Sequence, residues 1–310
     1  MVNKNTVEGF LHKLGLRSLT KDPDLTAGEV ADLLELAVHV KRDPGSFRTV
    51  LSGRYLALLF EKPSLRTRVT FELAIKQLGG DSIFSEGPVG GREPVKDVAR
   101  NLERWVNCIV ARTYLQSTIE ELARWSRIPV INALSDLYHP CQALADLLTL
   151  KERWGELAGR KLAYVGDGNN VAHSLLLSAT RQGMSVAVAS PRGYEPEAEV
   201  VAQARSTGAP VLITNSPEEA VAGADAVYTD VWASMGQEGQ KTARQKAFEA
   251  YQVTAQLMER AAPGALFMHC LPARRGEEVT DEVIESARSV VFDQAENRLH
   301  AQKALLLMIL

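Results

Sequence analysis

The sequence predicts an α/β protein with two doubly wound, parallel-sheet domains linked by helices. Along nearly the whole chain, short apolar runs of strand length alternate with longer segments whose apolar residues recur at helical spacing. Strands that alternate with helices are typical of parallel sheets covered by helices. The 310 residues suit two domains of about 150 residues each. Polar clusters follow several of the predicted strands, and ligands of such sheets bind beyond the carboxyl ends of the strands.

The first domain is expected to span residues 1–145. Its first helix is expected from Asp24 to Val40, because Thr26 and Glu29 have the spacing of a capping box ahead of a periodic apolar pattern. Strands are then expected at Leu56–Phe60, Cys108–Ala111 and Pro129–Ile131. The helices expected between them are Val69–Leu78, Val95–Trp105 and Thr118–Trp125.

The second domain is expected to span residues 146–310 and to repeat the alternation. A helix from Gln142 to Trp154 leads into it and is expected to mark the boundary, because Gly155 and Gly159 follow. The strands expected here are Lys161–Val165, Ser185–Ala189, Val211–Thr214, Ala226–Thr229, Leu266–Met268 and Val290–Phe292. The last helix, Glu296–Leu310, is expected from its position to pack back on the first domain.

Composition and charge argue against several classes of protein. The chain has 45% hydrophobic and 24% charged residues, the usual globular mix. Its net charge of −3 argues against a nucleic-acid surface, which needs a concentrated basic face. Three cysteines without a Cys-x-x-Cys pair indicate a reducing compartment rather than a disulfide framework. The chain has neither a signal-peptide pattern nor an apolar run near the ~20 residues of a membrane span, so a cytoplasmic location without a membrane partner is expected.

The segment Phe60–Arg68 predicts an anion site. Pro63 ends the preceding strand, and Ser64–Thr67 lie where the strand gives way to a helix. The N-terminus of a helix offers free N–H groups and the positive end of the helix dipole, so anions bind there. Arg66 and Arg68 suit a bidentate grip on phosphate. The alternative is a solvated basic turn.

Two further features of the first domain have polar groups beside predicted strands and helices. His139-Pro140-Cys141-Gln142 places an imidazole and an amide at the start of a helix, where they suit a polar carbonyl compound. The alternative is a helix cap with an incidental histidine. Arg112 follows a predicted strand, and alone it would more often form a surface ion pair.

Two clusters follow strands of the second domain. Thr229–Gly236 contains Asp230, which is placed to pair with an ammonium group, although the segment also suits an ordinary turn. His269–Pro272 contains Cys270, which would be a nucleophile only if a base lowered its pKa. We favour a small polar contact for this thiol, because no second histidine is identifiable as the base. A metal site is disfavoured, because adjacent ligands lack the usual spacing.

The loop Gly166–Asn170 imitates a dinucleotide-binding turn, but the fingerprint fails. A third glycine is required where Val171 stands, and the later acidic residue is missing. We therefore interpret Asn170 as an amide contact to a small polar substrate, with a structural asparagine-rich turn as the alternative. A nicotinamide dehydrogenase on this scaffold is disfavoured for the same reason. A non-catalytic protein that binds an anion or an amino acid stays open.

Together these segments resemble the aspartate/ornithine carbamoyltransferase family, and within it the ornithine branch, over nearly the whole chain. The family binds carbamoyl phosphate with a Ser-Thr-Arg-Thr-Arg segment, a later arginine and His-Pro-x-Gln. The ornithine branch adds Gly-Asp-x-Asn-Asn, Asp-x-x-x-Ser-Met-Gly and His-Cys-Leu-Pro. The resemblance implies that carbamoyl phosphate binds to Ser64, Leu65, Arg66, Thr67, Arg112, His139, Gln142, Cys270 and Arg298. It implies that ornithine binds to Asn170, Asp230, Ser234, Met235, Cys270 and Leu271. The catalytic residues it implies are Arg112, His139, Asp230, Cys270 and Arg298.

The resemblance also implies a reaction and an assembly. The carbamoyl group of carbamoyl phosphate would pass to the δ-amine of L-ornithine, giving L-citrulline and phosphate without a metal or cofactor. This is a reaction of the urea-cycle type that serves arginine biosynthesis in many organisms, but the sequence does not indicate its direction. A homotrimer, or a multiple of it, is expected. An N-acylated ornithine or putrescine is the closest alternative acceptor, whereas aspartate is disfavoured by the Ser-Met-Gly and His-Cys-Leu-Pro motifs.

This sequence departs from the family pattern at two places. Leu65 replaces the usual threonine, so one hydroxyl is lost although the backbone N–H remains. Many relatives carry a glutamine in a loop that reaches a neighbouring subunit, and Ser85–Val89 contains none. Arg92 is the candidate to replace it.

Overall fold

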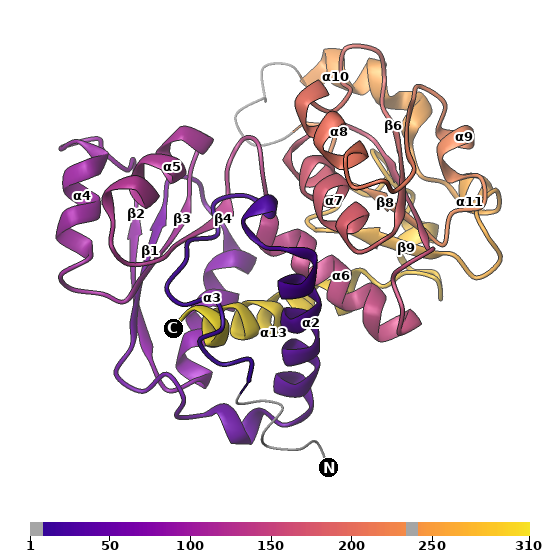
Figure 1. Cartoon of the computed structure of the whole chain (residues 1–310). Coiled ribbons are helices and arrows are strands. Elements are labelled where there is room, and N and C mark those ends of the chain that lie inside the picture. The colour runs from indigo at the N-terminus through magenta and orange to yellow at the C-terminus, as the bar shows by residue number, and fades with distance from the viewer. Residues whose placement is uncertain (1–8, 234–240) are drawn as a thin grey trace. The chain divides into compact units, whose positions relative to one another are not determined.

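The computed structural model describes residues 9–233 and 241–310 (Figure 1). The chain divides into two compact units. The first unit contains the chain up to Leu148 together with Glu296–Leu310, and the second unit spans Thr149–Ala295. The chain passes from the first unit to the second within the helix α6 (Pro140–Trp154) and returns within α13 (Val291–Ile309).

The first unit contains a four-stranded parallel sheet in the order β2-β1-β3-β4. Its strands are β1 (Tyr55–Phe60), β2 (Asp81–Glu86), β3 (Cys108–Arg112) and β4 (Val130–Leu134). Its helices, besides α13, are α2 (Ala27–Arg42), α3 (Leu65–Gln77), α4 (Val95–Leu102) and α5 (Gln116–Trp125), with short 3₁₀ turns η1 (Asp22–Asp24) and η2 (Pro44–Phe47). The strand order reverses between β1 and β3, so the carboxyl ends of these two strands form the switch point of the sheet.

Packing in the first unit follows from the sequence. The capping box predicted at the start of α2 is present, because Thr26 Oγ1 accepts the Glu29 N–H and the Glu29 carboxylate accepts the Thr26 N–H. One apolar cluster joins alternate residues of β1 and β3 to the inner faces of α4 and α5, among them Ala57, Ile109 and Leu122. The predicted docking of the last helix on the first domain is confirmed, since His12 N–H donates to the Leu307 carbonyl at 2.9 Å.

The second unit contains a five-stranded parallel sheet in the order β7-β6-β5-β8-β9. The strands are β5 (Lys161–Val165), β6 (Ser185–Ala189), β7 (Val211–Thr214), β8 (Ala226–Thr229) and β9 (Leu266–His269). The helices are α7 (Asn170–Arg181), α8 (Ala198–Arg205), α9 (Pro217–Val221), α10 (Lys241–Phe248), α11 (Ala255–Met258) and α12 (Asp281–Ile284), with the 3₁₀ turn η4 (Glu249–Tyr251). Here the strand order reverses between β5 and β8, which is the switch point of this sheet.

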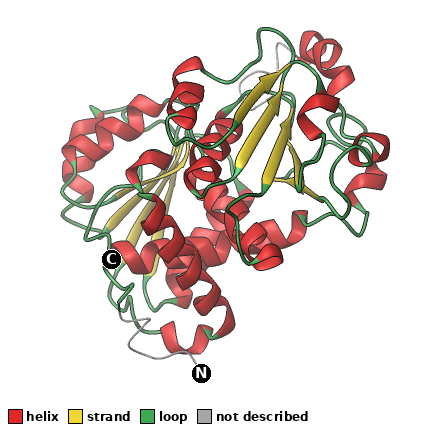
Figure 2. Ribbon diagram, turned by 45° about the vertical axis from the view of Figure 1, so that its right-hand side comes forward, coloured by secondary structure: helices red, strands yellow, loops and turns green. Residues whose placement is uncertain are grey.

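The predicted fold class is confirmed: each unit is a parallel sheet flanked by helices (Figure 2). Two element predictions fail. The strand β2 was not predicted, because it lies at the edge of its sheet and its polar sequence leaves Ile83 54% exposed. The strand predicted at Val290–Phe292 is wrong, since α13 begins at Val291. A short apolar run cannot be distinguished from a helical turn by periodicity alone.

The structure also shows the state of the cysteines and the character of the helices. The three cysteines, Cys108, Cys141 and Cys270, are free thiols. Among the residues that the structure describes, no helix has both the length and the apolar character needed to cross a membrane.

Candidate active site

One candidate site belongs to the first unit and lies at the switch point between β1 and β3, where Phe60 pairs with Arg112. Glu61 follows β1 directly, and its carboxylate accepts the N–H groups of Val89 at 2.9 Å and Tyr114 at 2.7 Å. These bonds tie the segments after β2 and β3 to the segment after β1. The loop that enters α3 is therefore fixed relative to the end of β3.

The N-terminus of α3 is open to an anion. Ser64 occupies the N-cap position, but its side chain makes no capping hydrogen bond, and the first turn contains no acidic residue. Leu65, Arg66 and Thr67 form this first turn, because the helix begins four residues before the predicted start at Val69. The unfilled N–H groups and the helix dipole create a positive site. Leu65 is 76% exposed, so its backbone rather than its side chain is the group that can serve such a site.

The two arginines of this segment differ in their surroundings. Arg68 stacks over the Phe84 ring at 3.7 Å and donates to Glu72 at 2.8 Å. No hydrogen bond or ion pair within the described residues engages the Arg66 guanidinium, which is half-buried. We therefore retain Arg66 and not Arg68 as the arginine of this turn for an anion.

Three buried side chains add charge and hydrogen-bonding capacity to this site of the first unit. Arg298 of α13 donates to Thr67 Oγ1, and Arg112 is 6% exposed at the end of β3. Burial, followed by the positive charges of Arg298 and Arg112, lowers the pKa of His139 well below its ordinary value. His139 is therefore a neutral imidazole beside two cations.

Gln142 supplies an oriented amide. Its Nε2 donates to Asp146 Oδ1 at 2.8 Å, so its NH₂ group faces the carboxylate. Its Oε1 is buried and has no hydrogen-bond partner within the described residues. This oxygen is therefore the atom that can accept an N–H group from a ligand. The neighbouring Cys141 is a packing residue, because burial raises the pKa of its thiol to about 12.

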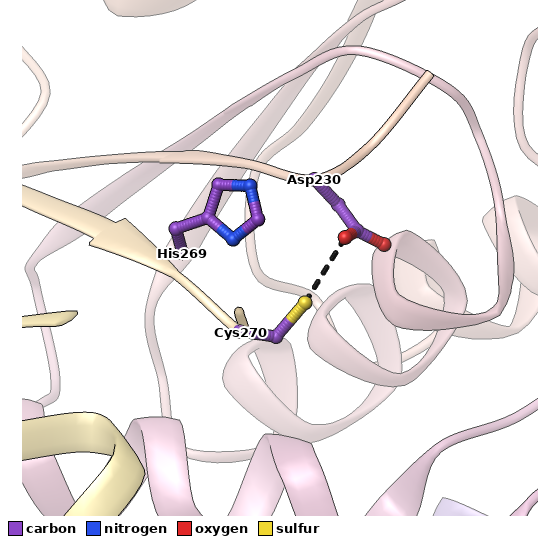
Figure 3. Close-up of side chains that lie close together, drawn as sticks. All are labelled: Asp230, His269 and Cys270. Atoms are coloured by element: carbon purple, nitrogen blue, oxygen red, sulfur yellow. Dashed lines mark hydrogen bonds between the residues drawn. The ribbon is translucent and has the colours of Figure 1, made fainter. Parts of the chain in front are cut away.

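A second candidate site belongs to the second unit and lies at the switch point between β5 and β8. Asp230 follows β8, and its two carboxylate oxygens have different donors. Oδ1 accepts a hydrogen bond from the Cys270 thiol at 3.0 Å (Figure 3). Oδ1 also accepts the Val231 N–H at 2.8 Å, and Oδ2 accepts a hydrogen bond from Asn169 Nδ2 at 2.9 Å. Donors on both oxygens fix the orientation of the Asp230 carboxylate.

The Cys270 thiol and the His269 ring lie beside Asp230, and their ligand atoms fall within 4.8 Å of one another. His269 Nδ1 accepts the Leu271 N–H at 2.9 Å, so the proton is on Nε2, which donates to Glu278 at 3.0 Å. Both ring nitrogens are thus used within the protein, and this arrangement does not offer an imidazole to a metal. The Cys270 S–H points to a carboxylate as a donor, which suits a contact residue better than a nucleophile.

The remaining predicted residues of the second unit fall in three places. Asn170 is the first residue of α7, and Leu271 is partly buried against the core of its unit. Ser234 and Met235 lie outside the described residues.

Sequence reasoning missed Asn169 as a neighbour of Asp230, although the Gly-Asp-x-Asn-Asn pattern marked its loop. It also missed the buried ion pair between Arg244 and Asp167 at 2.8 Å, for which the sequence carries no motif. The same Arg244 nitrogen donates to the Trp232 carbonyl at 2.8 Å.

Family models match both units. The model described as the carbamoyl-P binding domain of aspartate/ornithine carbamoyltransferases matches residues 17–152, and the model of the Asp/Orn binding domain matches residues 158–309. The chain belongs to the aspartate/ornithine carbamoyltransferase family.

Individual members of the aspartate/ornithine carbamoyltransferase family are similar over nearly their full length. The chain is 51% identical to the ornithine carbamoyltransferase of Carboxydothermus hydrogenoformans over 296 residues, which cover 93% of this chain and 95% of that protein. The structure of the ornithine carbamoyltransferase from Pyrococcus furiosus matches with a TM-score of 0.92 at 47% identity, covering 96% of this chain and 98% of the other. An acetylornithine transcarbamylase complexed with acetylcitrulline matches with a TM-score of 0.84 at 30% identity, covering 95% and 98%.

Proposed function

We propose that the protein is an ornithine carbamoyltransferase, which converts carbamoyl phosphate and L-ornithine into L-citrulline and phosphate. The observation that carries the proposal is the pair of switch-point sites. One unit has a positive helix N-terminus with Arg66, and the other has the oriented carboxylate of Asp230. Relatives that are about half identical to this chain and bear this name support the same reaction.

Carbamoyl phosphate suits the site of the first unit. Its phosphate would accept hydrogen bonds from the free N–H groups of the α3 first turn and from the Ser64 and Thr67 hydroxyls, and Arg66 and Arg298 would balance its charge. Arg112 and the neutral His139 would donate to the carbamoyl oxygen and stabilise the oxyanion that forms there. Gln142 Oε1 would accept the carbamoyl N–H.

Ornithine suits the site of the second unit. Asp230 would receive the α-ammonium group, and Asn170, Ser234, Met235 and Leu271 would complete the contacts to the amino acid. Cys270, which donates to Asp230, would line the ornithine site and favour the neutral form of the δ-amine. We do not assign it a covalent step.

In the transfer, one bond to the carbamoyl carbon replaces another. The lone pair of the neutral δ-amine forms a bond to the carbamoyl carbon, and the bond between that carbon and the phosphate oxygen breaks. The nitrogen loses one proton, and the departing phosphate is the acceptor present. Fixing both reactants on the protein supplies much of the rate by proximity and orientation.

Asp230 distinguishes the alternative acceptors. In an N-acylated ornithine the α-nitrogen carries no charge, so the Asp230 carboxylate would lose its ionic partner. Putrescine keeps an ammonium group, but it has no carboxylate for the remaining contacts. Free ornithine therefore fits best.

The test is to incubate the purified protein with carbamoyl phosphate and, separately, with ornithine, N-acetylornithine, putrescine and aspartate. Phosphate release and the ureido product are measured together. Citrulline formation from ornithine alone supports the proposal. Turnover only with another amine would preserve the carbamoyl-phosphate site and overturn the assignment of the second unit. Binding of carbamoyl phosphate without any turnover would favour a binding protein.

Three expectations stay predictions beside this proposal: a homotrimeric assembly or a multiple of it, a cytoplasmic location and a role in arginine biosynthesis. Light scattering of the purified protein measures the assembly. A mass of one chain would contradict the trimer.

A further inference from the structure

We propose that Asn169 is a positioning residue that holds the Asp230 carboxylate in the orientation that binds the substrate ammonium. The inference rests on the proposed function, and it assigns a task to a residue that does not itself need to touch ornithine. Four observations carry it: the fixed orientation of the Asn169 amide, its bond to Asp230, the complementary donors on the other Asp230 oxygen, and the rigidity of the loop.

The Asn169 amide has only one workable orientation. Its side-chain oxygen caps α7, accepting the N–H groups of Val171 at 2.9 Å and Ala172 at 3.2 Å, and it also accepts the Tyr164 hydroxyl at 3.3 Å. An NH₂ group could not take this position, because two backbone donors face it. The amide nitrogen must therefore point the other way, toward Asp230 Oδ2 at 2.9 Å.

Tyr164 keeps this arrangement over a wide pH range. Burial, followed by the negative charges of Asp230 and Asp167, raises the pKa of the Tyr164 hydroxyl well above its ordinary value. The hydroxyl thus remains a neutral donor to Asn169 Oδ1. A chain of hydrogen bonds then runs from Tyr164 through the Asn169 amide to the carboxylate.

The carboxylate is held from both sides. Asp230 Oδ1 accepts hydrogen bonds from the Val231 N–H and the Cys270 thiol. Asp230 Oδ2 accepts a hydrogen bond from the Asn169 amide nitrogen. With only the Oδ1 donors, the carboxylate plane could turn about the Cβ–Cγ bond, because that torsion has broad minima. Asn169 adds the second fixed point that sets the plane.

The loop that carries Asn169 is itself tightly fixed. A Cβ on Gly168 would lie 2.2 Å from the Pro196 nitrogen, so only glycine allows this close approach of backbones. The Gly168 N–H donates to the Tyr194 carbonyl at 2.8 Å. Arg244 binds Asp167 of the same loop and the carbonyl of Trp232, two residues beyond Asp230. The bridge between Asn169 and Asp230 therefore joins two anchored segments.

The decisive variant is Asn169→Asp in the full-length protein. Aspartate caps a helix as well as asparagine does, and it is nearly isosteric, so the cap of α7 is kept. It replaces the donor to Asp230 with an acceptor and places a second carboxylate beside the first. We expect KM for ornithine to rise roughly 10- to 100-fold near pH 8, with KM for carbamoyl phosphate within about 2-fold of the parent.

The pH profile separates positioning from capping. Two adjacent carboxylates share a proton as the pH falls, and the shared proton restores a donor between them. The ratio of the variant's ornithine KM to the parent's should therefore shrink as the pH is lowered from about 8 to about 6. Asn169→Ser keeps a capping oxygen but offers no second carboxylate. Its KM for ornithine should therefore rise at every pH, without the improvement at low pH. Thr254→Asp, a cap change at the start of α11, is the matched control and should leave both KM values unchanged.

The outcomes are distinct. Absence of citrulline formation by the parent protein would overturn the proposed function, whatever the variants do. An active parent whose Asn169→Asp variant binds ornithine normally would overturn the positioning role. The ornithine KM could instead rise equally and independently of pH in Asn169→Asp and Asn169→Ser, together with a lowered Tm. That result would show that Asn169 acts only as a helix cap, and it would also overturn the positioning role.

Discussion

The helices α3 and α7 occupy equivalent places in their units, yet their N-termini are used in opposite ways. Each begins after a strand at a switch point of a parallel sheet. The Ser64 side chain makes no hydrogen bond to the first N–H groups of α3. The Asn169 side chain, in contrast, accepts hydrogen bonds from the first N–H groups of α7. The comparison teaches that topology places a helix N-terminus at each switch point, and that the capping residue decides whether its N–H groups remain available to an anion.

The difference also explains the failed dinucleotide fingerprint. A phosphate at α7 would have to displace Asn169 Oδ1 from the N–H groups of Val171 and Ala172, and it would lie near the negative charge of Asp230. The N-terminus of α3 has Arg66 in its first turn instead. Phosphate therefore suits the first unit and an ammonium group suits the second.

The strongest test of the comparison is Arg66→Ala. Loss of this guanidinium should lower kcat/KM for carbamoyl phosphate by roughly 10³-fold, because a charge-assisted contact to a dianion is removed. Arg68→Ala is the matched control, since Arg68 already contacts Glu72 and Phe84. This variant should lower kcat/KM for carbamoyl phosphate by less than about 3-fold. Steady-state kinetics at saturating ornithine measure both. Equal effects of the two variants would show that the turn acts only through its net charge.

Asp230→Asn should affect the other unit alone. The variant keeps the shape but loses the charge that pairs with the ammonium group, so kcat/KM for ornithine should fall roughly 10²-fold. KM for carbamoyl phosphate should remain within about 2-fold of the parent value. Initial rates with each substrate varied in turn give both numbers, and unchanged ornithine kinetics would refute the assignment.

A pH series of thermal or denaturant unfolding tests the neutral state of His139. Its folded-state pKa lies below its unfolded value, so the unfolded chain binds a proton that the folded protein does not. The parent should therefore lose stability relative to His139→Asn as the pH falls below about 6.5, by at most about 1.4 kcal/mol per pH unit. The two proteins share every other titrating group, so the difference isolates this residue. If the parent instead becomes more stable than His139→Asn as the pH falls, His139 is protonated in the folded protein.

Leu65→Thr is expected to have the smallest effect. The side chain is 76% exposed at the start of α3, so its loss leaves no cavity, and stability should change by less than about 0.5 kcal/mol. The added hydroxyl gives the anion one more donor, and KM for carbamoyl phosphate should fall about 2- to 5-fold. Val69→Thr, an exposed position one turn later, is the control and should leave KM unchanged. A rise in KM for Leu65→Thr would show that the leucine itself favours binding.

Sequence reasoning was most accurate where the chain is buried. The strands β5, β6, β7 and β8 match their predicted bounds, because three of them are nearly continuous buried apolar runs and β7, though half-buried, is a run of β-branched and apolar residues. It failed for β2, whose exposed edge needs no apolar pattern, and at Val290–Phe292, where an apolar run begins a helix instead.

The same limit applies to the site. Motifs at strand ends marked Arg66, Arg112 and Asp230 as candidates, since parallel sheets gather their carboxyl ends at one edge. The role of Asn169 depends on a partner 61 residues further along the chain, and local spacing carries no trace of that contact. The different surroundings of Arg66 and Arg68 likewise depend on Phe84 of a strand that the sequence did not reveal.

The return of α13 to the first unit has a consequence for how the protein is made. Arg298, which donates a hydrogen bond to Thr67, is translated only after the entire second unit has been translated. A nascent chain that has already formed the sheet of its first unit therefore still lacks one of the cations of the proposed anion site. Affinity for phosphate compounds should therefore appear only after both units have been synthesised.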